Sequence, residues 1–277
     1  MPEAQKQLKK WACHKLECLG DYLEAHARTL NNTRCCYLEL FARGDSYVYK
    51  DTDCPTNGSE LRVLKIKPGF ARYIFVVRDR GQAQSLKRLT SPYNGGISII
   101  SGNPVHQRVL KQLFDLVPRS MASLALIDPP GYRRLRWSLI KKLAAHGNDW
   151  QGHKTELLII FPLEMALLRN LTRPECAPSI TRLYGNSQWL EIKRKWQEGK
   201  LEPDEVRQRL VALFKAGLKS LGYRYISDFS PTRFSRPPVY HIIWASDRNN
   251  RRKMIQEVWT KPRYLPGELF HNEENLS

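Results

Sequence analysis

Short apolar runs separated by helical patterns dominate the first half of the chain. The runs stand at residues 35–41, 73–77, 97–100, 122–127 and 156–161. Runs of this length that end at turn-forming residues are typical of buried strands. Helical patterns at 84–89 and 137–145 lie between them. Strands that alternate with helices predict a parallel sheet joined by right-handed crossovers.

The two ends of the chain carry other patterns. Residues 5–27 space their apolar side chains three and four positions apart, which predicts a helix. Residues 203–221 predict a second long helix, which Gly222 ends. Strands are expected at 223–229 and 239–245, and because their connection leaves no room for a crossover helix, they should be antiparallel.

This order of elements predicts an α/β fold of class I methyltransferase-like, Rossmann-like type. Its sheet has seven mainly parallel strands, an antiparallel C-terminal pair and extra helices between strands five and six. We expect an N-terminal helical segment at 1–34 packed on the domain, the α/β domain at 35–263 and a C-terminal tail at 264–277.

The chain is strongly basic. Its 277 residues carry 45 Lys and Arg against 27 Asp and Glu, a net charge of +18 that is spread along the sequence. Such a surface attracts polyanions through counterion release, so nucleic acid is the leading partner class. A basic protein without that partner is the open alternative.

Membrane and secretion signals are missing from the sequence. The longest apolar run, 157–163, is far shorter than the roughly 20 residues that cross a bilayer. The polar N-terminus lacks a signal-peptide pattern, so we expect a cytoplasmic protein. The six cysteines form no CxxC pair, and we expect no metal site. P-loop and HExxH motifs are also missing.

Several polar residues stand at expected strand ends, where doubly wound folds bind ligands. Glu39 interrupts the first strand, so it faces either a polar cleft or an arginine partner. The turn after it, from Phe41 through Arg43 and Gly44, resembles a nucleoside-cofactor turn, with Arg43 where a glycine is expected. Residues 42–59 should form a loop above this strand end.

The second and third strand ends add two candidate cofactor contacts. Asp79 either accepts hydrogen bonds from ribose hydroxyls or caps the following helix. Asn103 follows Gly102, where a side chain would contact adenine. The cofactor set is therefore Glu39, Phe41, Arg43, Gly44, Asp79 and Asn103.

The fourth strand leads into Asp128-Pro129-Pro130-Gly131-Tyr132. This sequence resembles the DPPY motif of amino-methyltransferases, which implies that Asp128 and Pro129 accept hydrogens from a base amine while Tyr132 stacks on the base. The alternative is a proline-rich turn with Asp128 as a cap. Five nearby basic residues are candidate nucleic-acid contacts: Arg133, Arg134, Arg136, Lys141 and Lys142.

Several short sequence stretches, spread over nearly the whole chain, resemble the pattern of one protein family. These are His14-Lys15 and Tyr22-Leu23-Glu24-Ala25, Tyr37 to Gly44, Gly58-Ser59-Glu60-Leu61, Phe75 to Asp79, Ile127 to Tyr132, Thr155 to Phe161, Leu183-Tyr184-Gly185 with Trp189, and Tyr240 to Trp259. Together they resemble the three-Cys-motif partner proteins, a bacterial, methyltransferase-like family. The resemblance implies a radical-enzyme-like partner protein with three cysteines. The chain differs from the family pattern at Arg43, Val77 and Asn103.

Two functions follow from these features. The first is S-adenosylmethionine-dependent methyl transfer to a nucleic-acid base amine. The second is a non-catalytic, methyltransferase-like module that binds nucleic acid or the radical-enzyme partner.

Overall fold

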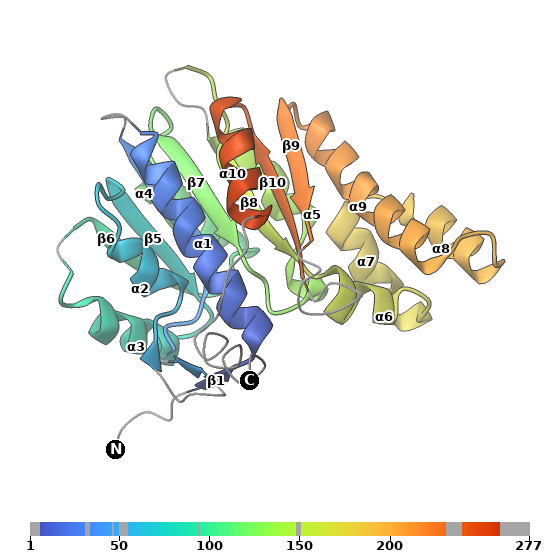
Figure 1. Cartoon of the computed structure of the whole chain (residues 1–277), viewed down its shortest axis with the longest axis horizontal. Helices are drawn as coiled ribbons and strands as arrows, with labels where there is room; N and C mark the ends of the chain where they lie inside the picture. Colours follow the sequence, from blue (N-terminus) through green and yellow to red (C-terminus); the bar gives the residue numbers. More distant parts are fainter. Residues whose placement is uncertain are drawn as a thin grey trace, which may run out of the picture.

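Seven strands form one sheet in the order β6-β5-β2-β7-β8-β10-β9 (Figure 1). The computed structural model describes residues 6–30, 34–45, 47–49, 55–93, 95–147, 151–230 and 240–260. The strands are β2 (Cys35–Ala42), β5 (Arg72–Val77), β6 (Ile97–Ser101), β7 (Ala122–Ile127), β8 (Glu156–Phe161), β9 (Tyr225–Phe229) and β10 (His241–Ser246). Strand β10 is antiparallel to both β8 and β9, whereas β6, β5, β2, β7 and β8 pair in parallel. The predicted fold class is confirmed.

Helices cover both faces of the sheet, so strand residues point alternately into two cores. In β2, Leu38 and Leu40 belong to one core and Tyr37 to the other. One face carries α1 (Lys10–Arg28), α2 (Ser59–Leu64), α3 (Arg80–Thr90) and α10 (Asn250–Thr260), and the other carries α4 (Gln107–Leu116), α5 (Trp137–His146), α7 (Ala177–Tyr184) and α9 (Pro203–Ser220). This is a three-layer α/β/α arrangement.

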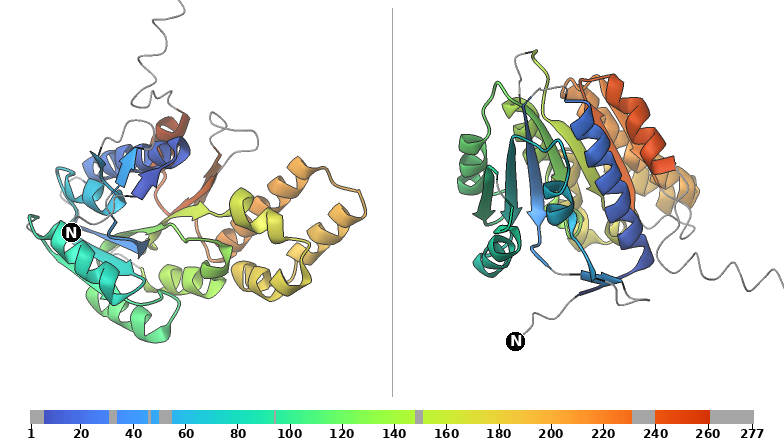
Figure 2. Two further views of the ribbon diagram at one scale, coloured as in Figure 1. Left: turned by 90° about the horizontal axis from the view of Figure 1, so that it is seen from below. Right: turned by 60° about the vertical axis from the view of Figure 1, so that its left-hand side comes forward.

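The helices between β8 and β9 extend past the β9 edge of the sheet (Figure 2). They include α6 (Leu168–Asn170) and α8 (Trp189–Gln197) besides α7 and α9. A capping box between Glu202 and Glu205 begins α9, and Gly222 follows its end with a φ of 85°. Among the helices that the structure describes, none has both the length and the apolar character of a membrane span.

The N-terminal segment differs from its prediction. The expected helix at 5–27 begins only at Lys10, because the preceding residues form β1 (Lys6–Leu8). Strand β1 pairs with β3 (Tyr47–Tyr49), which pairs with β4 (Pro55–Thr56), so the predicted loop at 42–59 contains part of a small sheet. Helix α1 packs on the sheet, with Leu19, Tyr22 and Leu23 in one of its two cores. The tail at 264–277 lies outside the described residues.

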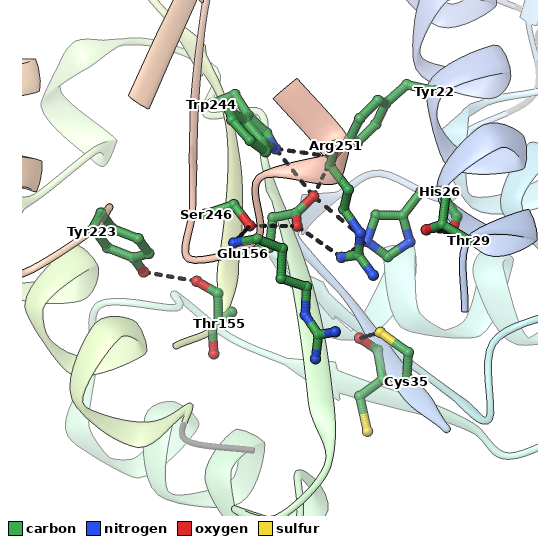
Figure 3. Close-up of polar contacts among 12 residues, drawn as sticks. Tyr22, His26, Thr29, Cys35, Thr155, Glu156, Tyr223, Trp244, Ser246 and Arg251 are labelled. Atoms are coloured by element: carbon green, nitrogen blue, oxygen red, sulfur yellow. Dashed lines mark hydrogen bonds and ion pairs between the residues drawn. The ribbon is translucent and has the colours of Figure 1, made fainter. Parts of the chain in front are cut away.

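A buried polar network joins α1 and α10 to the amino end of β8 (Figure 3). Both carboxylate oxygens of Glu156 are occupied: Oε2 accepts from Arg251 at 2.8 Å and from Ser246 at 2.9 Å, and Oε1 accepts from Trp244 at 3.1 Å. The Tyr22 hydroxyl of α1 also donates to Oε1. The carboxylate of this buried pair has its hydrogen bonds made, which is what a buried charge requires, while the Nε of Arg251 has no partner among the described residues.

His26 of α1 completes the network. Its Nε2 lies 3.5 Å from Glu156 and accepts from Arg251, and its side chain is fully buried. Burial and the charge of Arg251 lower the pKa of His26 to about 3. Burial alone would raise the pKa of Glu156, but Arg251 and His26 hold it at about 2. The network therefore fixes α1, whose Lys15 lies two turns earlier on the same face as Tyr22.

Candidate functional site

The predicted polar residues meet at one edge of the sheet. Val77 at the end of β5 pairs with Ala42 of β2 and Ser101 of β6, and Ile127 at the end of β7 pairs with Leu40. The carboxyl ends of four neighbouring strands therefore lie together. As predicted, Glu39, Asp79, Asn103 and Asp128 all belong to this edge.

Two pockets lie at this edge, and Phe41 and Arg43 line both of them. The first, here the β5–β6 pocket, has a volume of about 230 Å³. Its other lining residues are Ala42, Asp45, Val76, Arg78, Gln82, Gly102, Asn103, Pro104, Pro130 and Arg134. The second, here the α1 pocket, has a volume of about 250 Å³. It is lined mainly by Gln7, Leu8, Lys9, Trp11, Lys15, Glu39, Tyr47, Ser59, Glu60 and Asp128.

The wall between the pockets is the turn after β2. Phe41 has a φ of 75°, in the left-handed region that non-glycine residues rarely adopt, and the strand register shifts at this point. Glu60 of α2 holds the turn by accepting hydrogen bonds from the backbone N–H groups of Arg43 at 2.6 Å and Gly44 at 3.1 Å. No local pattern in the sequence indicates this role of Glu60.

Gly44 fits only as glycine. Its φ is 63°, and a Cβ atom there would lie 2.9 Å from the Cβ of Leu86 and 3.0 Å from the backbone oxygen of Gln82. The turn therefore packs directly on α3, and the Ser85 hydroxyl donates to the Gly44 carbonyl at 2.8 Å. Gly44 was predicted as a cofactor contact, but it lines neither pocket, and the close packing of this turn on α3 accounts for the glycine.

Glu39 lines the α1 pocket, and no arginine among the described residues donates a hydrogen bond to it. Its side chain accepts from the Tyr37 hydroxyl at 2.9 Å and from the Ser59 hydroxyl at 2.6 Å, and the residue is 3% exposed. Burial, followed by the charge of Glu60, raises the pKa of Glu39 well above its ordinary value. The sequence left open whether Glu39 faces a polar cleft or an arginine partner, and in the structure it faces the cleft.

Asp128 also lines the α1 pocket and is paired with Lys15 of α1. The Lys15 Nζ donates to Asp128 Oδ2 at 2.6 Å, with only 10% and 22% of the two side chains exposed. The other oxygen, Oδ1, accepts no hydrogen bond from the described part of the chain. The sequence does not indicate this role of Lys15, because the residue is 113 positions from Asp128 along the chain.

Asp79 and Asn103 are used differently from the cofactor roles expected for them. The Asp79 carboxylate accepts from the Gln82 backbone N–H at 3.0 Å and so caps α3, and Asp79 does not line the β5–β6 pocket. Asn103 does line this pocket, while its Oδ1 accepts from the Val105 backbone N–H at 3.2 Å. Of the two roles open for Asp79 from the sequence, the structure has the helix cap and not the ribose contact.

Tyr132 lies away from both pockets. Its ring is 3% exposed and belongs to the core on the α5 face, and its hydroxyl accepts from Arg133 at 3.3 Å. The ring therefore does not lie where it would stack on a base beside Asp128, and Gly131 stands between it and the two prolines, where the DPPY pattern has none. Pro129 is buried, whereas Pro130 lines the β5–β6 pocket.

One of the five predicted basic contacts reaches a pocket. Arg134 is exposed and lines the β5–β6 pocket. Arg133 also hydrogen bonds to the Cys176 sulfur at 3.3 Å, and Arg136 is half-buried with its Nε atom lacking a partner in the described residues. Lys141 and Lys142 are exposed on α5 and line neither pocket.

Comparisons with known proteins agree with this fold. No family model and no curated protein matches the chain. Among solved structures, the LPL1258 protein of Legionella pneumophila is 11% identical, with 88% of this chain and 90% of that protein covered and a TM-score of 0.53. An S-adenosylmethionine-dependent methyltransferase of Leishmania major is 10% identical over 85% and 73% of the two chains, with a TM-score of 0.42. A possible exported protein of Bordetella parapertussis is 13% identical with a TM-score of 0.39, where 80% of this chain spans 66% of that protein. The strand order with its antiparallel β10 is that of a methyltransferase-like fold, and the Legionella structure supports the fold alone.

This fold implies S-adenosylmethionine as a cofactor, and the pocket residues fit it poorly. Ribose hydroxyls in such folds are held by an acidic residue near the end of the second parallel strand, which here is β5. Val77 ends β5, and the nearest carboxylate, Asp79, caps α3 outside the pocket. The charged residues that do line the pocket are Arg43, Arg78, Arg134 and a single carboxylate, Asp45.

Proposed function

We propose that this protein binds nucleic acid at the strand-end edge, with an unpaired base entering the α1 pocket and its exocyclic amine held by Asp128. The observation that carries this proposal is the state of Asp128, whose Oδ2 is fixed by Lys15 while Oδ1 accepts no hydrogen bond from the described residues. A carboxylate held in this way is an acceptor for an amine N–H.

The charge of the chain supports the same partner. With +18 overall, the protein attracts polyanions, and Arg134 presents an exposed guanidinium beside the Asp128 turn. Phosphate contacts position a strand, whereas the Asp128 carboxylate distinguishes bases that carry an amine from those that do not.

The test is fluorescence anisotropy with labelled single-stranded RNA and DNA. We expect binding at about 50 mM salt that weakens steeply by about 200 mM, because each phosphate contact releases counterions. Strands rich in adenine or cytosine should bind more tightly than uracil or thymine strands, and Asp128→Asn should reduce that preference. The proposal fails if binding is missing at about 50 mM salt or does not change up to about 200 mM.

Methyl transfer from S-adenosylmethionine to the same amine is the second candidate function. It is favoured by the methyltransferase-like fold and by the position of Asp128 and Pro129 after β7. The charge of the β5–β6 pocket argues against it. Tritiated methyl incorporation into nucleic acid decides: if the wild-type protein transfers methyl groups and Asp128→Asn loses about two to four orders of magnitude, the protein is an enzyme.

The resemblance to three-Cys-motif partner proteins supports one further partner. On that resemblance we propose that the chain associates with a radical-enzyme-like protein that carries three cysteines. Co-purification of the two proteins, expressed together, is the test, and a complex that does not survive gel filtration would contradict it.

A further inference from the structure

The β5–β6 pocket carries an excess of positive charge. Arg43, Arg78 and Arg134 line it against one carboxylate, Asp45, which gives its lining a formal charge of +2. Among the described residues, no carboxylate lies within ion-pair distance of Arg134, and the exposed pair of Arg78 with Asp79, at 3.4 Å, is weak. These two guanidinium groups are therefore available to an anion.

The rest of the lining suits a base. Phe41, Val76 and Pro104 provide apolar surface, while Asn103 and Gln82 provide amide groups. At about 230 Å³ the pocket is below the size usual for drug-sized ligands, which leaves room for one nucleoside-sized group. It also lies at the carboxyl edge of the sheet, where doubly wound folds bind nucleotides.

S-adenosylmethionine matches this lining badly. Its sulfonium and ammonium groups outnumber its one carboxylate, so the molecule is cationic at neutral pH, as is the pocket. A phosphorylated nucleoside has the opposite charge, and its phosphate oxygens match the geometry of arginine.

We infer that the β5–β6 pocket binds a phosphorylated nucleoside, with the base against Phe41 and Asn103 and the phosphate held by Arg78 and Arg134. This inference deepens the proposed function and rests on it in placing a nucleotide at this edge of the sheet. The phosphate comes either from a free nucleotide or from the terminal residue of a strand.

Isothermal titration calorimetry with AMP, ADP, adenosine, S-adenosylmethionine and S-adenosylhomocysteine tests the inference. AMP and ADP should bind at least about ten times more tightly than adenosine and the two methionine-derived ligands, because only they bring phosphate to the arginines. Equal binding of AMP and adenosine, or tighter binding of S-adenosylmethionine, would overturn it.

Substitutions locate the site. Arg78→Gln and Arg134→Gln should each weaken AMP binding about tenfold and leave adenosine binding unchanged. Arg80→Gln is the matched control, because Arg80 is an exposed arginine two residues from Arg78 that does not line the pocket. An Arg80→Gln effect as large as that of Arg78→Gln would show a general charge effect and overturn the assignment.

Oligonucleotides separate the two sources of phosphate and the two proposals. A 5′-phosphorylated strand that competes with AMP, when its unphosphorylated form does not, identifies a strand end as the ligand; competition by neither form identifies the free nucleotide. If strands bind normally but no mononucleotide does, the inference is wrong while the proposed function stands. If AMP binds but no strand does, the proposed function is wrong while the pocket assignment stands.

Discussion

His26 should make the protein sensitive to mild acid. Its side chain is fully buried between Arg251 and Phe70, whose ring stacks on it at a centroid distance of 5.7 Å. The pKa of His26 is lowered from 6.5 to about 3, chiefly by burial and then by Arg251. As the pH falls, the unfolded chain therefore takes up this proton before the folded protein does.

The sign and size of the effect follow from linkage. Above pH 6.5 His26 is neutral in both the folded and the unfolded protein, so it does not lower the free energy of unfolding. As the pH falls from 6.5 towards 3, only the unfolded chain takes up the proton, and the free energy of unfolding decreases progressively. At about 1.4 kcal/mol per pH unit, His26 alone should remove about 2 kcal/mol of the free energy of unfolding between pH 8 and pH 5. Glu156, with a pKa lowered from 4.5 to about 2, adds to the loss only below pH 4.5.

Urea unfolding of wild type and His26→Gln at pH 8 and pH 5 measures this effect. Glutamine retains an acceptor for Arg251 and does not titrate, so at pH 8 the difference between the proteins reports packing alone. At pH 5 that difference should shift by about 2 kcal/mol in favour of the variant. An unchanged difference at the two pH values would refute the assignment of a buried, neutral His26.

Three other substitutions test the fold around the site. Glu156→Gln should lower the free energy of unfolding by about 3–5 kcal/mol in urea, because Arg251 is left unpaired. Adding Arg251→Met should recover much of this loss. Equal stabilities of the single and double variants would contradict the ion pair. Gly44→Ala should lower the free energy of unfolding by about 1–3 kcal/mol, because its φ and its contact with Leu86 leave no room for a methyl group; an unchanged melting temperature would show that the turn is not packed as described. Asp79→Ala should cost about 1 kcal/mol as a lost cap while AMP binding persists; loss of AMP binding without loss of stability would restore the ribose role.

The sheet could be predicted because its signals are local. The runs at 122–127 and 156–161 match β7 and β8 residue for residue, since both strands are buried on both faces and read as continuous apolar stretches. Helices α2 and α4 were not predicted. Helix α2 is only six residues long, and strand β1 depends on pairing with a segment about 40 residues away, which no local pattern reveals.

The sequence predicted where the candidate site lies, but it did not predict the contacts that its residues make. Strand ends located Glu39, Asn103 and Asp128 correctly at one edge, because parallel strands bring their carboxyl ends together. The partners of these residues were not predictable: Lys15 reaches Asp128 across 113 positions of sequence, and Glu60 holds the turn after β2 from the start of α2. The stacking role expected for Tyr132 is not seen, because its ring packs in the core on the α5 face, and the DPPY-like pattern gave no sign of that packing.

Hydrogen–deuterium exchange would show whether nucleic acid binds at the strand-end edge of this methyltransferase-like fold. The protein would be measured at about 50 mM salt with and without a saturating adenine-rich single strand. We expect slower exchange at 41–45, 101–106 and 129–135 when the strand is bound, with α9 unaffected. Protection confined to the helices beyond the β9 edge, with the strand-end segments unchanged, would contradict it.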